Sequence, residues 1–401
     1  MDRYLERPLQ VQGQNERQML FVSGPRQVGK TSLLQSLATA AAEAGYLNWD
    51  LPAQRALIVA GVEAVAAHCE LDRLREERLF LAFDELHKYR HWRDFLKGLF
   101  DAYQDRARIM VTGSAALQTF RRGGDSLMGR YFPYTLHPLS VAELTHGQVA
   151  APGKQPPGPP DSGSWDTLWR FGGFPEPALR ADTRFYRRWR RLRSEQLLRE
   201  DLRDLSRIRE LDQVEILAMT LAAQVGQLAN MSTLAQQCAV AVDTVRRWLA
   251  TLEGLFYCFS VRPWHRNVAR GLRKQPKYYL WDWSLVDDPG ARFENLVASA
   301  LLKAVHFWSE SGEGDFGLYF IRDKQGAEVD FCVTRDGRPW MLLEARSGRG
   351  SLSPALQRFR EQTGAPLALQ VVRDLAYVEA DCFSMERPTV VPAKTFLSQL
   401  V

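Results

Sequence analysis

Residues 21–32 read FVSGPRQVGKTS, and their glycines, lysine and hydroxyls stand at the offsets of a phosphate-binding loop. The run from Gly24 to Thr31 fits the pattern G-x-x-x-x-G-K-[ST], with an apolar run before it and a helical pattern after it. The two glycines permit backbone angles and a close approach that a Cβ would block. The N–H groups of such a loop, with the positive end of the following helix, surround a polyphosphate. The alternative is a chance match in a glycine-containing turn, and the correct flanks on both sides argue against it.

The side chains of this loop have expected partners on a nucleoside triphosphate. Lys30 would reach the β and γ phosphates, and the Thr31 hydroxyl would complete the shell of a Mg²⁺ ion. The residues that we expect around the nucleotide are Gly24, Pro25, Arg26, Gln27, Val28, Gly29, Lys30, Thr31, Ser32 and Ser114.

The loop stands in a region where short apolar runs alternate with helical patterns, which predicts a parallel sheet covered on both faces. The expected strands are Met19–Val22, Tyr46–Trp49, Leu79–Phe83 and Ile109–Val111. The expected helices include Ser32–Ala44, with Gly45 as its C-cap, and His91–Tyr103.

Two carboxylates follow the buried run Leu79–Phe83, at the strand end where ligands sit in open α/β sheets. We expect Asp84 to hold the Mg²⁺ ion and Glu85 to orient or activate the attacking water. The alternative is that both acids only open the next helix, where they would complement its dipole. After the next strand, Ser114 either senses the γ-phosphate or belongs to a turn.

Length and composition place the chain among soluble globular proteins of two to three domains. It has 401 residues, a net charge of +5 and five scattered cysteines without metal-ligand spacing. The charged start MDRYLERPLQ has no signal-peptide core, and no apolar stretch is long enough to cross a bilayer. We therefore expect a cytoplasmic protein without a membrane partner.

Changes in composition divide the chain into five parts. The expected parts are a nucleotide-binding core at 1–147, a Pro/Gly-rich linker or loop at 148–164, a helical region at 165–227, a compact helical unit with an aromatic, basic tail at 228–283 and a C-terminal domain at 284–401.

The stretch 231–256, MSTLAQQCAVAVDTVRRWLATLEGLF, has the pattern of a helix–turn–helix. Ser232 is the expected cap of a first helix, and Asp243 or Thr244 of a second, which would leave Arg246 and Arg247 facing outward. The following basic and aromatic segment adds Arg266 and Arg270, so these four arginines are candidate DNA contacts. A protein-contact module or a lid is the alternative.

An arginine-rich run, 184–210, precedes this module. Acids such as Glu195 and Glu200 interleave with its later arginines, which favours a solvated helix laced with ion pairs over a nucleic-acid track.

Taken in order, several motifs resemble a prokaryotic family of AAA-type ATPases with a C-terminal domain of unknown function. The matching stretches are FVSGPRQVGKTS, FLAFDELHKYRHW, IMVTGSAAL, DSLMGRYFPYTLHPLSVAEL, FGGFPEPAL, LLREDLRDLSRI, RFENLVASALL and GAEVDF. The resemblance implies an AAA-type P-loop core, a helical and winged-helix-like middle region and a terminal α/β domain similar to PD-(D/E)xK (restriction-endonuclease-like) nucleases. It also implies that Arg130 lies near the nucleotide, in cis or toward a neighbouring subunit, with Arg121 and Arg122 as rivals.

The terminal domain carries the acids of a nuclease-like site. Glu294 stands on an expected helix, Phe293–Leu302, while Asp330 and Glu344 lie on two strands of an expected hairpin and could together bind a divalent metal. The related nuclease pattern ends in E-x-K, but here the last position is Arg346, which stays charged and cannot act as a base. A nuclease-like scaffold kept for folding or binding is therefore the favoured interpretation.

These observations predict an enzyme that binds and hydrolyses ATP with Mg²⁺, and whose nucleotide state controls a DNA- or protein-binding C-terminal half. The alternatives are an ATP-switched binding module with little turnover and an ATPase-coupled, metal-dependent nuclease. A homo-oligomer is compatible with either.

Overall fold

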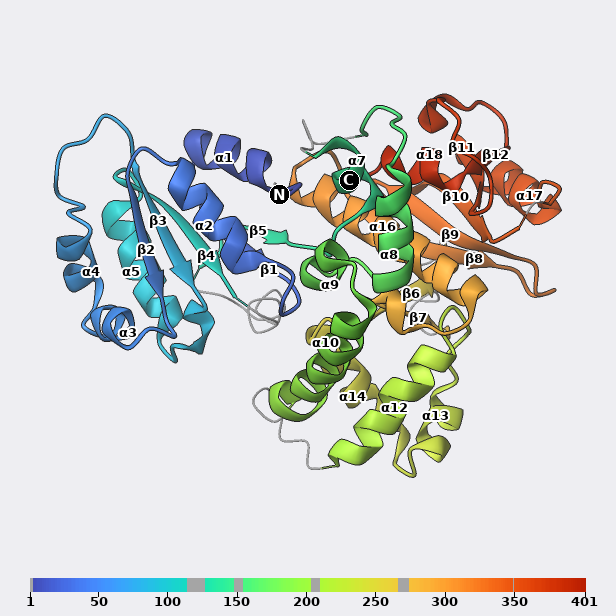
Figure 1. The fold of residues 1–401 in the computed structure, drawn as a ribbon, viewed down its shortest axis with the longest axis horizontal. Helices are drawn as coiled ribbons and strands as arrows, with labels where there is room; N and C mark the ends of the chain where they lie inside the picture. The colour runs from blue at the N-terminus through green and yellow to red at the C-terminus, as the bar shows by residue number, and fades with distance from the viewer. Residues whose placement is uncertain (1–2, 114–126, 148–153, 203–209, 266–273, 349) are drawn as a thin grey trace. The chain divides into compact units, whose positions relative to one another are not determined.

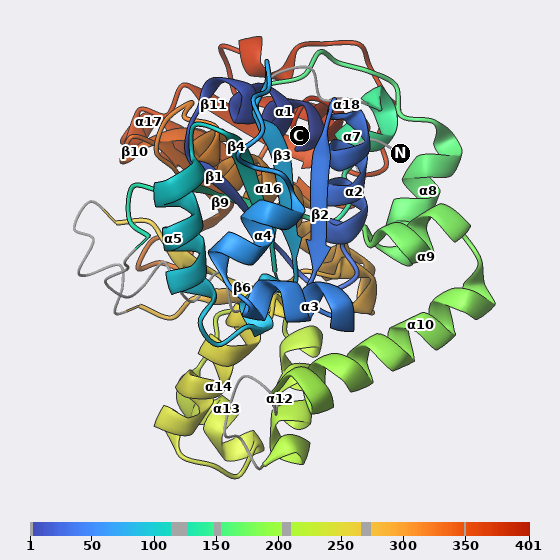
Figure 2. The same ribbon diagram turned by 90° about the vertical axis from the view of Figure 1, so that its left-hand side faces the viewer.

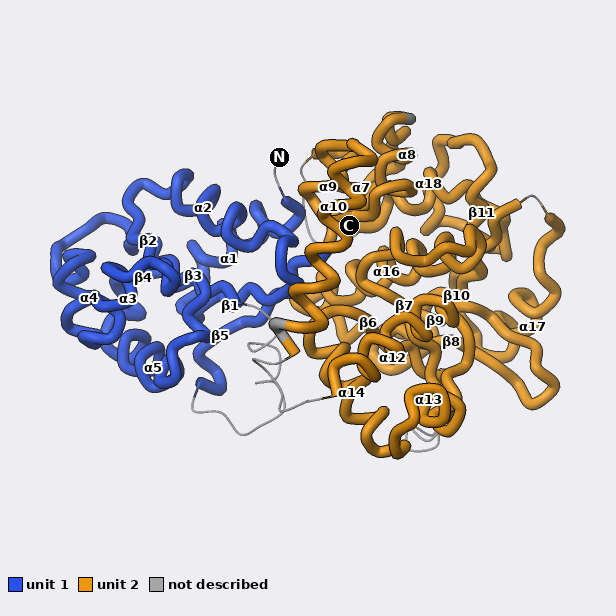
Figure 3. Tube along the Cα trace, turned by 60° about the horizontal axis from the view of Figure 1, so that its bottom comes forward, with its two compact units in different colours: residues 1–137 blue, residues 138–401 orange. Residues whose placement is uncertain are grey.

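The computed structural model describes residues 3–113, 127–147, 154–202, 210–265, 274–348 and 350–401, without the side chains at 162, 200 and 201. The chain divides into two compact units, Met1–His137 and Pro138–Val401 (Figure 3). None of the helices in these ranges is both long enough and apolar enough to span a bilayer.

The first unit is built on a five-stranded sheet in the order β2-β3-β4-β1-β5, counted over the described residues (Figure 1). Every neighbouring pair is parallel, which confirms the predicted parallel sheet. The strands are β1 Met19–Ser23, β2 Ala44–Asn48, β3 Leu79–Asp84, β4 Ala107–Thr112 and β5 Tyr131–Thr135. The helices are α1 Glu6–Asn15, α2 Lys30–Ala40, α3 Pro52–Val59, α4 Val62–His68, the 3₁₀ turn η1 Leu86–Lys88 and α5 Trp92–Tyr103.

Alternate strand residues face opposite layers of helices. Phe21, Leu81 and Val111 belong to a core cluster with buried side chains of α3, α4 and α5. Leu20 and Met110 point to the other face, toward α1 and α2. Burial on both faces explains why these strands appear in the sequence as short, nearly continuous apolar runs.

The helix after the nucleotide loop is shorter than predicted. It ends at Ala40, and Gly45 lies inside β2, so the prediction of Gly45 as a C-cap is wrong. A Cβ on Gly45 would stand 3.0 Å from Cys69 Sγ and 3.1 Å from a methyl of Leu81. Close packing within the sheet therefore accounts for this glycine.

The second unit is built on a seven-stranded sheet in the order β12-β11-β10-β9-β8-β6-β7, again counted over the described residues. Strands β8, β9 and β10 form an antiparallel meander, and β11 and β12 add in parallel. The strands are β6 Cys258–Pro263, β7 Lys277–Leu280, β8 Phe316–Arg322, β9 Glu328–Arg335, β10 Arg338–Arg346, β11 Leu367–Val372 and β12 Thr389–Pro392.

The second unit also contains helices, some connecting the strands of this sheet and others preceding it in the chain (Figure 1). Those within the sheet's own stretch of chain are η4 Trp283–Leu285, α16 Pro289–Glu310, α17 Pro354–Thr363, η5 Cys382–Ser384 and α18 Ala393–Ser398. Those that precede the sheet are α7 Val141–His146, α8 Ser162–Phe171, α9 Pro175–Arg180, α10 Thr183–Glu195, the π-helical η3 Gln196–Asp201, α12 Leu211–Ala223, α13 Met231–Gln237 and α14 Val242–Gly254.

The observed boundaries differ from those expected from composition. Residues 138–147 group with the second unit, because α7 packs on α18 and the Glu143 carboxylate bonds Lys303 of α16. The described end of the Pro/Gly-rich segment is also packed: the Gln155 N–H donates to Gln399 O at 2.9 Å. Residues 154–161 thus form a loop, one of the two alternatives expected for this segment, and the loop packs against the C-terminal region.

The predicted helix–turn–helix is present with different caps. Asn230, and not Ser232, caps α13 through its side-chain oxygen, which accepts from the N–H groups of Ser232 and Thr233. The second helix starts earlier than predicted, and its N-cap position, Ala241, provides no side-chain bond. The antiparallel pair β6 and β7 follows, and β6 also pairs with β8, so this hairpin is continuous with the C-terminal sheet.

Candidate functional site

The nucleotide loop joins the carboxyl end of β1 to α2, and its shape requires glycine at two positions. Gly24 has φ +155°, and a Cβ there would stand 2.5 Å from the Leu136 carbonyl oxygen. Gly29 has φ 99° and forms the left-handed N-cap of α2. The Val28 carbonyl between them accepts a bond of 2.5 Å from the buried Arg3 guanidinium, which fixes the loop to the rest of the unit.

The amino end of α2 has the donors that an anion needs. Its N-cap has no side chain to bond the first-turn N–H groups, and its first turn holds no acid. Main-chain donors and the helix dipole therefore present positive potential at the loop. This arrangement fits the β and γ phosphates of a nucleotide.

Lys30 contributes the cation of the loop. Its side chain is buried, and its ammonium donates to the Gly24 carbonyl at 3.0 Å and to the Pro25 carbonyl at 2.8 Å. The loop's own carbonyls therefore hold the charge in place beside the first-turn N–H groups.

Asp84, at the end of β3, is the polar centre of the site. It is 1% exposed and accepts hydrogen bonds from Thr31 of α2 at 2.8 Å, from Tyr46 of β2 at 3.0 Å and from Thr112 of β4. Burial, followed by the nearby Asp84 charge, raises the pKa of Tyr46 to about 12, so its phenol remains a donor at neutral pH. The parallel sheet thus brings three hydroxyls to one carboxylate.

Thr31 and Asp84 also fit the chemistry of a magnesium site. A hydroxyl and a carboxylate are hard oxygen donors, and Mg²⁺ takes its other ligands from phosphates and water. Among the described residues there is no group of three or more His, Cys, Asp or Glu that could hold a metal alone, and a site completed by phosphates needs none.

Glu85 follows Asp84 in the left-handed region, with φ 56°. Its carboxylate lies 3.2 Å from the Lys88 ammonium and 3.8 Å from His87 Nε2. Burial lowers the pKa of His87, and the positive charges of Lys88, Lys30 and Arg26 act in the same direction. The side chain of Glu85 is 22% exposed, so water can reach it.

Arg130 is not where the resemblance implies. It precedes β5, where Tyr131 pairs with Met19 at the amino end of β1, whereas the nucleotide loop follows the carboxyl end at Ser23. Its guanidinium bonds both oxygens of Asp101, at 2.8 and 3.1 Å. A role for Arg130 in its own chain's site is therefore wrong, and a role at a neighbouring subunit remains a prediction. The rivals Arg121 and Arg122, together with Ser114, lie outside the described residues.

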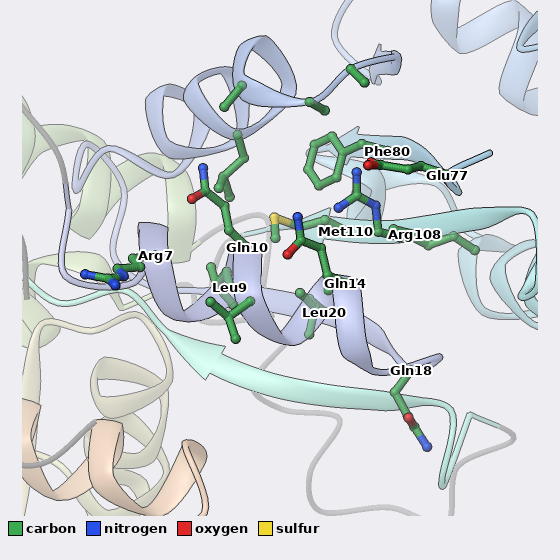
Figure 4. Close-up of a pocket in the computed structure, with 17 residues that line it drawn as sticks. Arg7, Leu9, Gln10, Gln14, Gln18, Leu20, Glu77, Phe80, Arg108 and Met110 are labelled. Atoms are coloured by element: carbon green, nitrogen blue, oxygen red, sulfur yellow. The ribbon is translucent and has the colours of Figure 1, made fainter. Parts of the chain in front are cut away.

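A cavity of about 470 Å³ at the amino ends of β1, β3 and β4 is separate from this site. Figure 4 shows Gln10 and Gln14 of α1 on one wall and Arg108 and Met110 on the other.

The four nuclease-like residues lie on adjoining elements of the second unit. Asp330 accepts from the Ala345 N–H at 2.9 Å, and Glu344 accepts from Arg346 and Ser353, both at 2.6 Å. Arg346 also stands 3.7 Å from Asp330, so it pairs with both acids. Desolvation raises the pKa of Asp330 and of Glu344.

Lys277, on β7, supplies a second cation to the same cluster, whereas from the sequence it was expected only as part of the basic and aromatic segment after the helix–turn–helix. Its ammonium lies 2.5 Å from Glu328 and 3.5 Å from Glu294, and 4% of its side chain is exposed. Burial raises the pKa of Glu294 to about 7, with the Asp330 charge acting in the same direction. Burial alone would lower the pKa of the Lys277 ammonium, but the negative charges of Glu294, Glu328 and Asp330 outweigh it and raise that pKa, so Lys277 stays charged.

Two of the four candidate DNA-binding arginines are described. Arg246 and Arg247 are exposed on α14, opposite the buried stripe of Val245, Trp248 and Leu249, as predicted. Arg246 pairs with Asp243 at 2.8 Å, and Arg247 bonds Thr244 at 3.3 Å. Arg266 and Arg270 lie outside the described residues.

The parallel sheet, the glycine-shaped loop and the carboxylate at the end of β3 are the features of a P-loop nucleoside triphosphatase. Residues 16–145 match the family model described as an AAA domain, and residues 162–288 and 289–393 match two models described as domains of unknown function. The chain therefore contains an AAA domain, followed by these two domains of unknown function.

The chain is also similar to two uncharacterized proteins, from Mycobacterium bovis and Mycobacterium tuberculosis. Each is 26% identical over 361 residues, which cover 84% of this chain and 73% of the relative. Among solved structures, a Walker-type ATPase of Pyrococcus abyssi matches with a TM-score of 0.45 at 15% identity, over 72% of this chain and 94% of that one. AMPPCP-bound DnaA from Aquifex aeolicus matches with a TM-score of 0.31 at 15% identity, over 61% and 86%.

Proposed function

We propose that the first unit hydrolyses ATP with Mg²⁺, and that its nucleotide state controls a DNA- or partner-binding surface of the second unit. The observation that carries the proposal is the hydrogen bond from Thr31 to Asp84, because it joins the phosphate loop to the strand-end carboxylate. In P-loop enzymes these two side chains hold the magnesium ion.

Each residue of the site has a part in this reaction. The N–H groups of the loop and the Lys30 ammonium bind the β and γ phosphates, and Thr31 and Asp84 would hold Mg²⁺, which would neutralise charge on the phosphate oxygens. Glu85 orients the attacking water, and the Lys88 ammonium at 3.2 Å keeps its carboxylate in place.

The test separates binding from turnover. Glu85→Gln should retain ATP affinity and lose steady-state hydrolysis by roughly 100-fold or more, whereas Lys30→Ala should lose binding. The matched control is Glu76→Gln, an exposed acid of the same unit, which should behave as wild type. Wild-type turnover in Glu85→Gln would remove Glu85 from this role.

A short segment supports control of the second unit by the nucleotide. Leu136 donates from its N–H to Ser23 O at 2.7 Å, and its carbonyl is the oxygen packed against Gly24. The chain continues through Pro138, whose carbonyl accepts a bond of 3.4 Å from Lys303, and the same ammonium bonds Ser140 at 2.9 Å and Glu143. The segment 136–143 therefore begins beside the loop and ends in a buried ion pair on α16.

The second unit has the element order expected of the two predicted modules. Helices α12, α13 and α14 followed by the pair β6 and β7 support a winged helix, and α16, β8, β9, β10, α17 and β11 support a restriction-endonuclease-like core. Lys277 and Arg346 pair with the acids that a nuclease would use for metal, which favours binding over cleavage. If the protein cuts DNA in the presence of Mn²⁺ and Asp330→Ala abolishes the cutting, the nuclease interpretation is supported instead.

A slow switch is the second candidate. Tight retention of ATP with little hydrolysis in the presence of DNA would favour it over steady turnover.

A further inference from the structure

Helix α10 carries four exposed arginines on one face: Arg184, Arg187, Arg188 and Arg191. Their spacing places them within an arc of about 100° on a helix of 3.6 residues per turn. The opposite face holds the buried side chains Tyr186, Trp189 and Arg193, and Figure 2 shows the helix at the periphery of the second unit. We call these four residues the α10 arginine row.

The fold neutralises the arginines around the row but not the row itself. Arg180 pairs with Glu176 at 3.4 Å, Arg193 with Asp282 at 3.8 Å and Arg199 with Glu215 at 3.6 Å. Within the described part of the chain, no member of the row forms an ion pair. Glu195 follows Arg191 at i+4 and remains exposed without an ion pair in that same part. The ion pairs predicted for the later arginines of this run therefore do not extend to the row among the described residues.

The row weakens the helix that carries it. Its members neighbour one another at i+3 and i+4, where like charges repel. Arg184 also lies in the first turn, where the helix dipole disfavours a cation. No contact within the described unit offsets this cost, which is typical of a surface kept for a partner.

We infer that the α10 arginine row binds the phosphate backbone of a nucleic acid. The row spans seven residue steps, or about 10 Å, with one positive charge per roughly 3.5 Å. A DNA strand carries one phosphate per about 3.4 Å of axis, so the two charge densities match. The guanidinium group pairs with phosphate through two parallel N–H bonds.

Among the described residues, the ring next to the row is not free to stack on a base. The aromatic ring beside the row, Phe185, is already covered by the Arg180 guanidinium at 4.1 Å from its centre. Binding is therefore independent of sequence and falls steeply with salt. The inference goes beyond the proposed function, because the row belongs neither to α14 nor to the nucleotide loop and needs no ATP.

The experiment is a fluorescence-anisotropy titration of labelled duplex DNA, single-stranded DNA and RNA with the full-length protein across a salt series. Changing all four residues of the row to glutamine should lower affinity at about 0.1 M salt by at least roughly 100-fold and reduce the log–log salt slope by about 3–4. The matched control removes four exposed positive charges elsewhere in the unit, through Arg170→Gln, Lys324→Gln, Arg338→Gln and Arg387→Gln. It should keep the wild-type slope.

Two further measurements make the result decisive. The row variant should melt at or above the wild-type temperature, because glutamine keeps helix propensity and removes repulsion. Its ATPase rate without DNA should equal that of wild type, so a failure of ATP hydrolysis leaves this test intact. An unchanged slope in the row variant, or a loss found only with Arg246→Gln/Arg247→Gln, overturns the inference. Equal affinity for anionic vesicles or polyglutamate, or no binding to any of the three nucleic acids, also overturns it.

Discussion

Among single residues, Asp84 depends most on its neighbours, because three hydroxyls from three elements converge on one buried carboxylate. Tyr46→Phe removes one of these donors, and a hydrogen bond to a charged group contributes about 1.5–3 kcal/mol. We expect the free energy of unfolding to fall by about 1.5 kcal/mol in urea titration, with turnover reduced less than in Asp84→Asn. Tyr103→Phe is the control, since that half-buried phenol has no hydrogen bond among the described residues. Equal loss in both variants would contradict the role of Tyr46.

His87 gives the site a dependence on pH. Burial lowers its pKa below the ordinary 6.5, so between the two values the unfolded chain binds more protons than the folded one. The His87 contribution to stability is complete above pH 6.5 and is lost as pH falls toward the folded value. Urea unfolding of wild type and His87→Asn from pH 7.5 to 5 should show wild type losing stability relative to the variant. Parallel profiles would exclude this assignment.

What could be predicted at this scale followed from offsets along the chain. Gly24, Lys30 and Asp84 were found because a loop and a strand end are local patterns. Tyr46 and Thr112 were missed as partners of Asp84, because their convergence depends on β3 lying between β2 and β4. The only signal in the sequence was a polar side chain within each apolar strand, and that signal does not identify the residue to which the side chain bonds.

At the scale of elements, the buried Lys277 of β7 forms ion pairs with Glu328 of β9 and Glu294 of α16, and so links three elements. Lys277→Met would remove the cation nearest to Glu294 and leave Glu328 with only the exposed Arg322, and breaking a buried pair costs about 3–5 kcal/mol. Lys277→Met/Glu328→Gln should recover part of that loss, which a double-mutant cycle in urea measures. Exposed Lys324→Met should change stability by less than about 0.5 kcal/mol. Additive effects of the two substitutions would show that the pair does not act together.

Element types were predicted better than element ends. Buried strands and the stripe on α14 are set by periodicity, which the sequence carries directly. The first cap was predicted wrongly because Ser232 and Asn230 are both good N-cap residues, and in the structure Asn230 occupies the N-cap position. Glu195 likewise follows Arg191 by four residues in the sequence, yet no ion pair joins the two among the described residues.

Across the whole molecule, composition could not place the boundary between the units. A Pro/Gly-rich segment is typical of a linker, yet its described end bonds to Gln399 and Ser398 of the C-terminal region. Likewise α7 follows β5 directly, but the buried Glu143–Lys303 pair ties it to α16. In both cases a bonding partner more than 150 residues away in the sequence determines the unit to which the segment belongs, and no local pattern reveals that partner.

The segment 136–143 makes a prediction for the molecule as a whole. If nucleotide at the loop changes affinity for DNA by some factor, DNA must change affinity for nucleotide by the same factor. We expect a factor of roughly 5 to 150 between the ATP and ADP states, measured by anisotropy for DNA and by calorimetry for nucleotide on the Glu85→Gln protein. Replacing the buried ion pair by Lys303→Met/Glu143→Leu keeps the site packed, since an apolar pair of similar volume often preserves stability. That variant should bind both DNA and nucleotide, but its affinity for DNA should be nearly the same in the ATP and ADP states. An undiminished factor in a folded Lys303→Met/Glu143→Leu protein would show that the coupling runs through some other part of the chain.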